Sequence, residues 1–267
     1  ICTIYAHQPD STTYRRPKIG LVLSGGGAKG LAHIGVLQIL EEVGIVPDYI
    51  TGTSMGSIIG GLYAAGYSAA EISELNHTIT WGDYLTNNIS MNQIAMEQKY
   101  DYGRYMAEFP LRHGKLFLPS GLVESQSFWQ LFHNLTWPVL GVTHFDSLPI
   151  PFRCCATEIM KGNIKTFEEG SLHFAMRGSM AIPGFFSPVI EDDTVIYVDG
   201  GVGRNFPVDE VIKMGADIVI GVYVGANEML DPMKARSVDK ILMQTAFYAG
   251  LKESREVMEK CNILIIP

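Results

Sequence analysis

The feature that most constrains this chain is a strand, helix and strand pattern within residues 18–54. Residues 18–23 are a short apolar run leading into a glycine cluster, typical of a buried strand that enters a tight turn. Residues 30–42 carry apolar side chains at the spacing of one helical face: Leu31, Ile34, Leu37 and Leu40. A second strand is predicted to end at Ser54, after a helix stop at Gly44. The pattern predicts a right-handed βαβ unit and a sheet with a parallel core.

Later segments repeat this alternation. Strands are predicted at residues 151–159, 194–201, 216–225 and 262–267, and helices at 208–215 and 237–260. The chain is therefore expected to have an α/β fold, a three-layer α/β/α sandwich with a mainly parallel central sheet.

Length and composition favour one domain. The chain has 267 residues, 47% of them hydrophobic, which is enough for a sizeable core. Residues 1–17 are mostly polar and are expected to form an N-terminal extension, with a single domain over 18–267. Residues 76–145 mix aromatic and methionine side chains with polar ones and predict a helical, cap-like insertion. Two roles fit this insertion, a flexible cap over a site for an apolar ligand or an ordinary helical region packed on the sheet.

Charge, hydropathy and cysteine spacing argue against nucleic-acid binding, a bilayer span, a zinc site and a disulfide framework. The net charge is −8, so no overall basic field attracts nucleic acid or anionic lipid, and any transient membrane-surface contact is expected to be apolar. The uncharged stretch 50–70 is interrupted by glycines and serines and does not resemble a bilayer span. The four cysteines show neither metal-site spacing nor a disulfide framework. Because the chain begins with Ile1, we expect that an upstream segment was removed, and export to the cell envelope or medium is slightly favoured over a cytoplasmic location.

A serine between glycines stands where the second strand ends. Gly52, Ser54 and Gly56 match G-x-S-x-G at a strand-to-helix junction, the context of a nucleophile elbow. A side chain at either glycine would collide with neighbouring backbone at so sharp a turn. The following helix start would offer unpaired amides to a developing negative charge. Alternatively, Ser54 is only the N-cap of that helix.

The glycine cluster at residues 24–33 predicts an anion-binding loop. Successive glycines let backbone amides converge on one anion, as in an oxyanion hole. Gly25, Gly27 and Gly30 also satisfy the G-x-G-x-x-G pattern of a dinucleotide site. That site needs an acid at the end of the second strand, where Ser54 stands instead. Leu31 occupies the lysine position of a phosphate-binding Walker loop.

The base for such a serine is expected to be a carboxylate. No histidine follows His173, so a triad in the usual Ser, acid, His order has no imidazole late in the chain. A triad would have to use one of the earlier histidines, His113, His133, His144 or His173, with an acid such as Asp101 or Asp146. Each of these histidines, and His33 as well, is instead interpreted as structural or solvent-exposed. Asp199 ends a predicted strand, and Gly200 and Gly201 behind it allow a tight turn that leaves the carboxylate at the strand end. A plain Asp-Gly turn is the alternative.

Three motifs in this order resemble the patatin-like phospholipase family. They are the glycine-rich loop Gly25, Gly26, Gly27, Ala28, Lys29 and Gly30, the elbow Gly52 to Gly56, and the triplet Asp199, Gly200 and Gly201. Residues 177–189 also resemble the family's segment before the aspartate, with Gly178 where alanine is usual. The resemblance covers about residues 18–225 and is weaker in the insertion and after residue 225.

The resemblance implies a serine hydrolase that cleaves acyl esters of phospholipids or lysophospholipids without a metal or other cofactor. It implies a Ser54–Asp199 dyad, oxyanion donors at Gly25 to Gly27, and a loop-supporting role for Lys29 in preference to contact with a lipid phosphate. Residues 18–267 would then be a single patatin-like catalytic domain. The alternatives are a nucleotide-binding oxidoreductase and a catalytically silent lipid-binding module.

Overall fold

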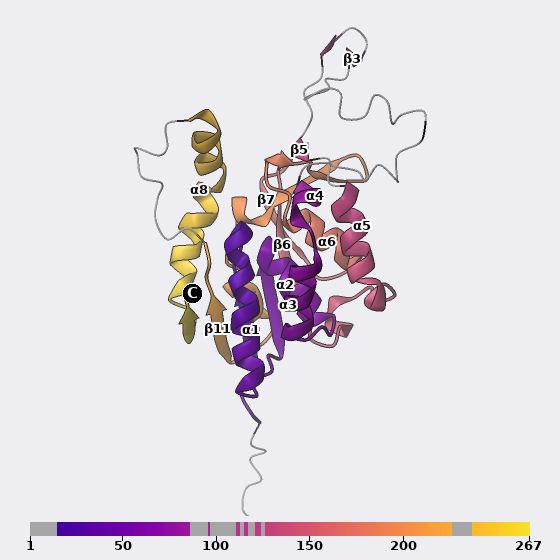
Figure 1. Cartoon of the computed structure of the whole chain (residues 1–267). Helices are drawn as coiled ribbons and strands as arrows, with labels where there is room; N and C mark the ends of the chain where they lie inside the picture. Colours follow the sequence, from indigo (N-terminus) through magenta and orange to yellow (C-terminus); the bar gives the residue numbers. More distant parts are fainter. Residues whose placement is uncertain are drawn as a thin grey trace, which may run out of the picture.

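The fold is described from a computed structural model of the chain (Figure 1). The structure describes residues 15–85, 96, 111–112, 115–116, 121–123, 126–225 and 237–267. The predicted N-terminal extension lies almost entirely outside these residues, as does most of the central part of the predicted insertion.

A mixed eight-stranded sheet forms the centre of the described structure. Its parallel part has the spatial order β12 (Ile263–Ile265), β11 (Ile218–Val222), β1 (Ile19–Leu23), β2 (Tyr49–Thr53) and β6 (Phe152–Glu158). Antiparallel strands complete one side: β10 (Val195–Asp199) and β9 (Val189–Glu191) continue the order, and β7 (Asn163–Phe167) pairs with β6. The predicted parallel core is confirmed, and the antiparallel side is an addition to it.

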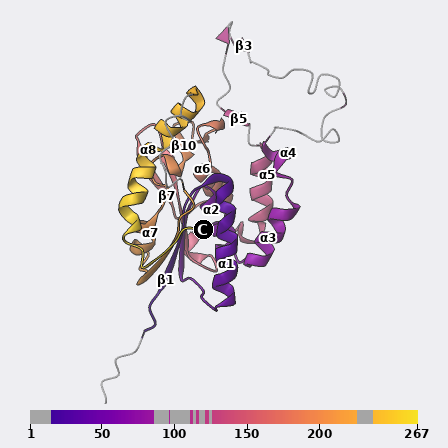
Figure 2. The same cartoon turned by 60° about the vertical axis from the view of Figure 1, so that its left-hand side comes forward.

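Helices cover both faces of the sheet (Figure 2). Alternation along β1 sends Leu21 and Leu23 into the larger core and Val22 into the smaller one. The larger core contains residues of α1 (Ala32–Glu42), α2 (Met55–Ala64), α3 (Ala69–Thr78), α5 (Gln126–Leu135) and α6 (Leu172–Ser179). The smaller core contains residues of α7 (Val208–Lys213) and α8 (Val238–Met258). The three-layer sandwich is therefore confirmed.

The glycine cluster delays the first helix. A 3-10 turn, η1 (Gly27–Leu31), precedes α1, so the regular helix begins at Ala32 rather than at the predicted residue 30. Gly27 has a φ of 55°, a conformation that glycine adopts without strain. The loop can therefore turn sharply between β1 and η1.

The predicted insertion contributes both helices and short strands where it is described. Besides α5 it contains α4 (Trp81–Leu85) and the short strands β3 (Leu111–Arg112), β4 (Lys115–Leu116) and β5 (Gly121–Val123). β5 pairs in parallel with β8 (Gly184–Phe186), outside the insertion. Phe128 of α5 meets Phe186 edge to face at 5.3 Å between ring centroids. No helix within the described residues is long and apolar enough to cross a membrane.

Candidate active site

Ser54 lies at a strained corner between β2 and α2. Its φ of 53° and ψ of −122° are rare for a residue with a side chain, and such strain concentrates at functional sites. Neighbouring backbone approaches the corner closely on both sides. A Cβ added to Gly52 would lie 2.4 Å from the Gly56 carbonyl oxygen, and one added to Gly56 would lie 2.2 Å from that of Leu23. The predicted steric need for both glycines is therefore visible in the geometry.

Ser54 and Asp199 come together across the sheet. The Ser54 hydroxyl donates a hydrogen bond of 2.7 Å to Asp199 Oδ2. The other carboxylate oxygen accepts from the Gly201 amide, also at 2.7 Å. Both side chains are buried, with 6% of Ser54 and 1% of Asp199 exposed. The carboxylate is thus aimed at the hydroxyl and shielded from water.

Burial changes the acidity of Asp199. Loss of hydration raises the pKa of this carboxyl to about 6, although the hydrogen bonds from Ser54 and Gly201 act in the opposite direction. The group is still ionised at neutral pH and is a stronger base than a solvated carboxylate.

The described histidines lie away from this pair. His33 is buried, its Nε2 lies 2.8 Å from the Ser24 carbonyl oxygen, and loss of hydration lowers its pKa to about 4. His133 and His173 stack edge to face on each other, and His144 pairs with Glu169. None of the described histidines bonds to Ser54 or Asp199. His113 and Asp101 lie outside the described residues. No described group of three or more His, Cys, Asp or Glu side chains could hold a metal.

The glycine loop runs beside the corner. The Gly25 amide donates to the Asn205 carbonyl oxygen at 3.1 Å, so it already has a partner. The amides of Gly26 and Gly27 precede the first bond of η1 and have no hydrogen-bond partner among the described residues. A Cβ on Gly30 would lie 2.4 Å from Met55 Cγ, so this glycine lets the loop pack against α2. Lys29 is exposed on the loop.

Ser179 supports the corner and was not singled out from the sequence. Its hydroxyl accepts a hydrogen bond of 2.9 Å from the Ser54 amide and donates one of 2.6 Å to the Cys155 carbonyl oxygen. Ser179 therefore connects the elbow to β6 at the end of α6. The only sequence signal for it was its position in the segment 177–189.

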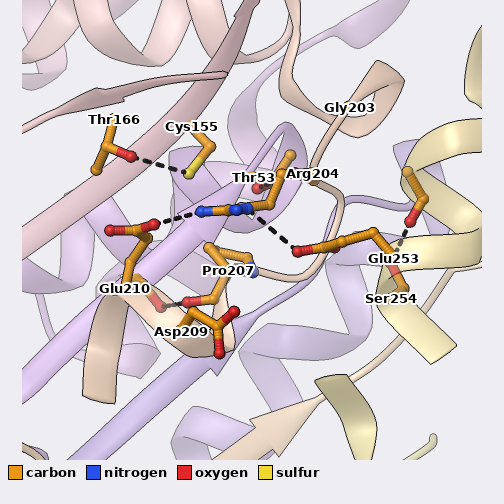
Figure 3. A network of polar contacts seen from close by, with 12 residues as sticks. Thr53, Cys155, Thr166, Gly203, Arg204, Pro207, Asp209, Glu210, Glu253 and Ser254 are labelled. Atoms are coloured by element: carbon orange, nitrogen blue, oxygen red, sulfur yellow. Dashed lines mark hydrogen bonds and ion pairs between the residues drawn. The ribbon is translucent and has the colours of Figure 1, made fainter. Parts of the chain in front are cut away.

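Arg204 ties the same corner to the opposite layer (Figure 3). Its carbonyl oxygen accepts from the Thr53 hydroxyl at 3.1 Å, and its amide donates to the Gly200 carbonyl oxygen. Its guanidinium pairs with Glu210 of α7 and, at 3.1 Å, with Glu253 of α8. The role of Arg204 was also not predicted from the sequence, because Thr53 and Glu253 are distant from it in the chain.

Helix α8 presses directly on the turn after Asp199. That turn is the 3-10 segment η4 (Gly200–Val202). A Cβ on Gly200 would lie 2.2 Å from the Cys155 carbonyl oxygen, and one on Gly250 of α8 would lie 2.0 Å from that of Gly201. Phe247 of α8 also lies within 3.0 Å of the position of a Gly201 Cβ. The turn that orients Asp199 is therefore enclosed by β6 and α8.

Two cavities meet at Ser54. The first, the apolar cavity, has a volume of about 350 Å³ and lies toward α2 and the insertion. It is lined by Gly27, Ala28, Leu31, Ser54, Met55, Ile58, Trp81, Phe128, Met180, Ile182, Phe185 and Phe186. The second, the α8 cavity, has a volume of about 320 Å³ and lies between the glycine loop and α8. Its polar lining residues include Lys29, Asp199, Asn205 and Gln244. Ser54, Gly27 and Ile182 line both cavities.

A serine at a strained strand-to-helix corner of an α/β sandwich has the geometry of a nucleophile elbow, and here a carboxylate instead of an imidazole accepts the serine hydrogen bond. A family model described as patatin-like phospholipase matches residues 21–212, and the chain belongs to this family.

Known proteins similar to this chain support the assignment. Lysophospholipase NTE1 of Kluyveromyces lactis is 30% identical over 231 residues, covering 80% of this chain and 13% of its own length. An uncharacterised NTE family protein of Mycobacterium bovis is 31% identical over 79% of this chain and 50% of its own length. The chain thus spans half or less of these curated relatives. VipD of Legionella pneumophila shares the fold, with a TM-score of 0.51 and 17% identity over 83% of this chain and 52% of the VipD chain.

Proposed function

We propose that this chain is a lipid acyl hydrolase that works through a Ser54–Asp199 dyad. The observation that carries the proposal is the hydrogen bond of 2.7 Å from the Ser54 hydroxyl to a buried carboxylate, with no described imidazole between them. Family membership supports the same reaction class. The names of the lysophospholipase relatives support an acyl ester of a phospholipid or lysophospholipid as the substrate.

In the proposed mechanism, Asp199 takes the hydroxyl proton while Ser54 Oγ attacks the ester carbonyl carbon. The carbonyl oxygen becomes an oxyanion, for which the free amides of Gly26 and Gly27 are the donors, and each such donor contributes about 3 to 4 kcal/mol at comparable sites. Asp199 then gives this proton to the leaving alkoxide, so that the alcohol departs and an acyl-enzyme remains. Asp199 then activates water, which releases the fatty acid and restores Ser54. Gly25, already bonded to Asn205, shapes the loop in this scheme.

The lining of the apolar cavity supports a fatty acyl group as its occupant. Every side chain around it apart from Ser54 is apolar, including Trp81 and Phe128 from the insertion region. A lipid substrate also requires transient contact with a membrane surface or micelle. Ser54 and Asp199 supply nucleophile and base, so a chelator is expected to leave hydrolysis of a soluble ester unchanged. The predicted loop-supporting role of Lys29 stays a prediction.

The test is labelling of the intact protein with a fluorophosphonate probe, followed by mapping of the adduct. Modification of Ser54, and its absence in Ser54→Ala, is the expected result. Hydrolysis of a soluble p-nitrophenyl ester should fall at least 10³-fold in both Ser54→Ala and Asp199→Asn, on the scale seen when members of a catalytic unit are removed. An unlabelled, inactive protein that still binds liposomes would favour the silent lipid-binding module. A thermal shift with nicotinamide nucleotide would favour the oxidoreductase.

A further inference from the structure

The α8 cavity has no assigned role once the apolar cavity takes the acyl chain. The acyl chain and the alcohol of an ester extend from the reacting carbonyl in different directions. Because Ser54 lines both cavities, a carbonyl placed at its hydroxyl has one cavity on each side. The hydroxyl groups of a polar alcohol would find no partner among the apolar side chains of the first cavity. The alcohol is therefore matched to the α8 cavity.

The wall formed by α8 includes one polar side chain. Gln244 lines the cavity together with Met243, Phe247 and Leu251 of the same helix, and these three neighbours are apolar. The Nε2 atom of Gln244 has no hydrogen-bond partner among the described residues and is covered by protein, so the side-chain amide must turn toward the cavity to donate there. Buried donors are nearly always paired in native structures, so pairing with a ligand oxygen in the cavity favours that turn.

We propose that the α8 cavity is the leaving-group subsite and that Gln244 selects alcohols bearing a hydroxyl, such as a glyceryl group, over simple alkanols. This rests on the proposed function of the Ser54–Asp199 pair. The amide of Gln244 donates to an oxygen of the glyceryl backbone, while Met243 and Phe247 contact its carbon atoms. A site built to bond a hydroxyl discriminates against the analogue that lacks it, since the protein donor is then left unpaired. Gln244 is thus a specificity residue outside the dyad.

A matched pair of substrates tests this subsite. Propyl decanoate and monodecanoylglycerol share the acyl chain and the carbon skeleton of the alcohol and differ only in two hydroxyl groups. The wild-type chain is expected to have the higher kcat/KM for the glyceryl ester. In Gln244→Met the ratio of the two kcat/KM values should fall roughly fivefold, the effect of one neutral hydrogen bond. Gln244→Leu serves as a second variant should the first fail to fold.

Two control variants test whether the change in the kcat/KM ratio is specific to the alcohol side of the site. Gln130 is exposed on α5 and lines none of the cavities described above, so Gln130→Met should leave the ratio unchanged. Phe185→Ala in the apolar cavity should change kcat/KM for both esters alike. A wild-type chain indifferent to the hydroxyls, or a Gln244→Met variant that keeps the wild-type ratio, would overturn the subsite.

The proposed function can fail separately. A wild-type chain that hydrolyses neither ester, or a Ser54→Ala variant as active as wild type, contradicts the dyad itself. Fluorophosphonate labelling of Gln244→Met at the wild-type rate would establish that the variant has an intact corner, because the probe reacts with Ser54 by losing fluoride and carries no glyceryl group.

Discussion

Asp199 holds a charge where water cannot solvate it. Its pKa is about 6 in the folded chain, against an ordinary value of 3.8. Between these values the folded state binds more protons than the unfolded state, so the free energy of unfolding falls as the pH rises. The ionised carboxylate therefore destabilises the fold fully above pH 6, by roughly 3 kcal/mol.

Asp199→Asn should accordingly stabilise the protein while abolishing turnover. The amide oxygen still accepts from Gly201, and the buried charge is gone. We expect the free energy of unfolding to rise by roughly 2 to 3 kcal/mol near pH 8 and to be almost unchanged near pH 4, where the wild-type carboxyl is mostly protonated. Urea unfolding at both pH values measures this. A variant less stable than wild type near pH 8 would show that the charge is better compensated than its burial indicates.

The same pKa sets the acid limb of activity. The proposed base must be unprotonated, so kcat/KM for a soluble ester should fall about tenfold per pH unit below about pH 6 and be level above it. Initial rates across this range, with stability checked at each pH, measure the limb. A profile centred near the ordinary value of 3.8 would mean that Asp199 is hydrated in the free enzyme.

Elements distant in the chain hold the turn after Asp199 in place. Arg204 links the end of β2, the turn after Asp199, and helices α7 and α8 (Figure 3). Glu253 is half-buried, and loss of hydration raises its pKa to about 7 despite the nearby Arg204. Removing the guanidinium would leave Glu253 without its cation and Glu210 with only the exposed Lys213.

Arg204→Met is therefore expected to destabilise the protein by about 3 kcal/mol and to loosen α8 first. Hydrogen exchange of the α8 amides and urea unfolding measure the two effects. Lys213→Met is the matched control, because Lys213 also pairs with Glu210 but is 67% exposed, and such surface pairs contribute about 0 to 1 kcal/mol. Equal losses in the two variants would show that Arg204 is no more than another surface cation.

Local patterns predicted the elements that carry the proposed nucleophile and base. Apolar runs ending in glycine-rich turns mark β1, β2 and the end of β10, so Ser54 and Asp199 could be chosen from the sequence alone. Ser179 and Arg204 could not, since their roles depend on contacts that only the closed sheet creates. The antiparallel strand β9 was missed because it has only three residues. Strand β7 was missed because Phe167 is its one buried residue, so it lacks the apolar run that marks the central strands.

At the scale of the whole molecule, net charge and surface chemistry determine how a lipid can be approached. The chain carries −8, so anionic lipid is not attracted to it as a whole. Helix α8 instead exposes Leu242 and Tyr248, at 63% and 57%, close in sequence to the cavity residue Met243. Exposed apolar side chains beside a cavity mouth are suited to an interface.

Leu242→Glu should weaken hydrolysis of lipid in vesicles and leave a soluble ester unaffected. Burying a charge at the interface opposes adsorption, and a reduction of roughly tenfold is expected at low vesicle concentration. Rates on both substrates, with vesicle sedimentation as a direct binding measurement, give the comparison. Lys240→Glu, a change at another exposed position of α8, controls for added negative charge. Equal loss on the soluble ester would mean that the change disturbs the site.

Strand order has a consequence for anyone who shortens this protein. The family match ends at residue 212, yet β11 and β12 follow it and β11 is the neighbour of β1 inside the sheet. A fragment trimmed to the recognised stretch would turn β1 into an unpaired edge, uncover the Asp199 turn and invite strand-mediated aggregation. The segment that the family model matches is thus shorter than the segment needed to complete the sheet and to enclose the turn after Asp199.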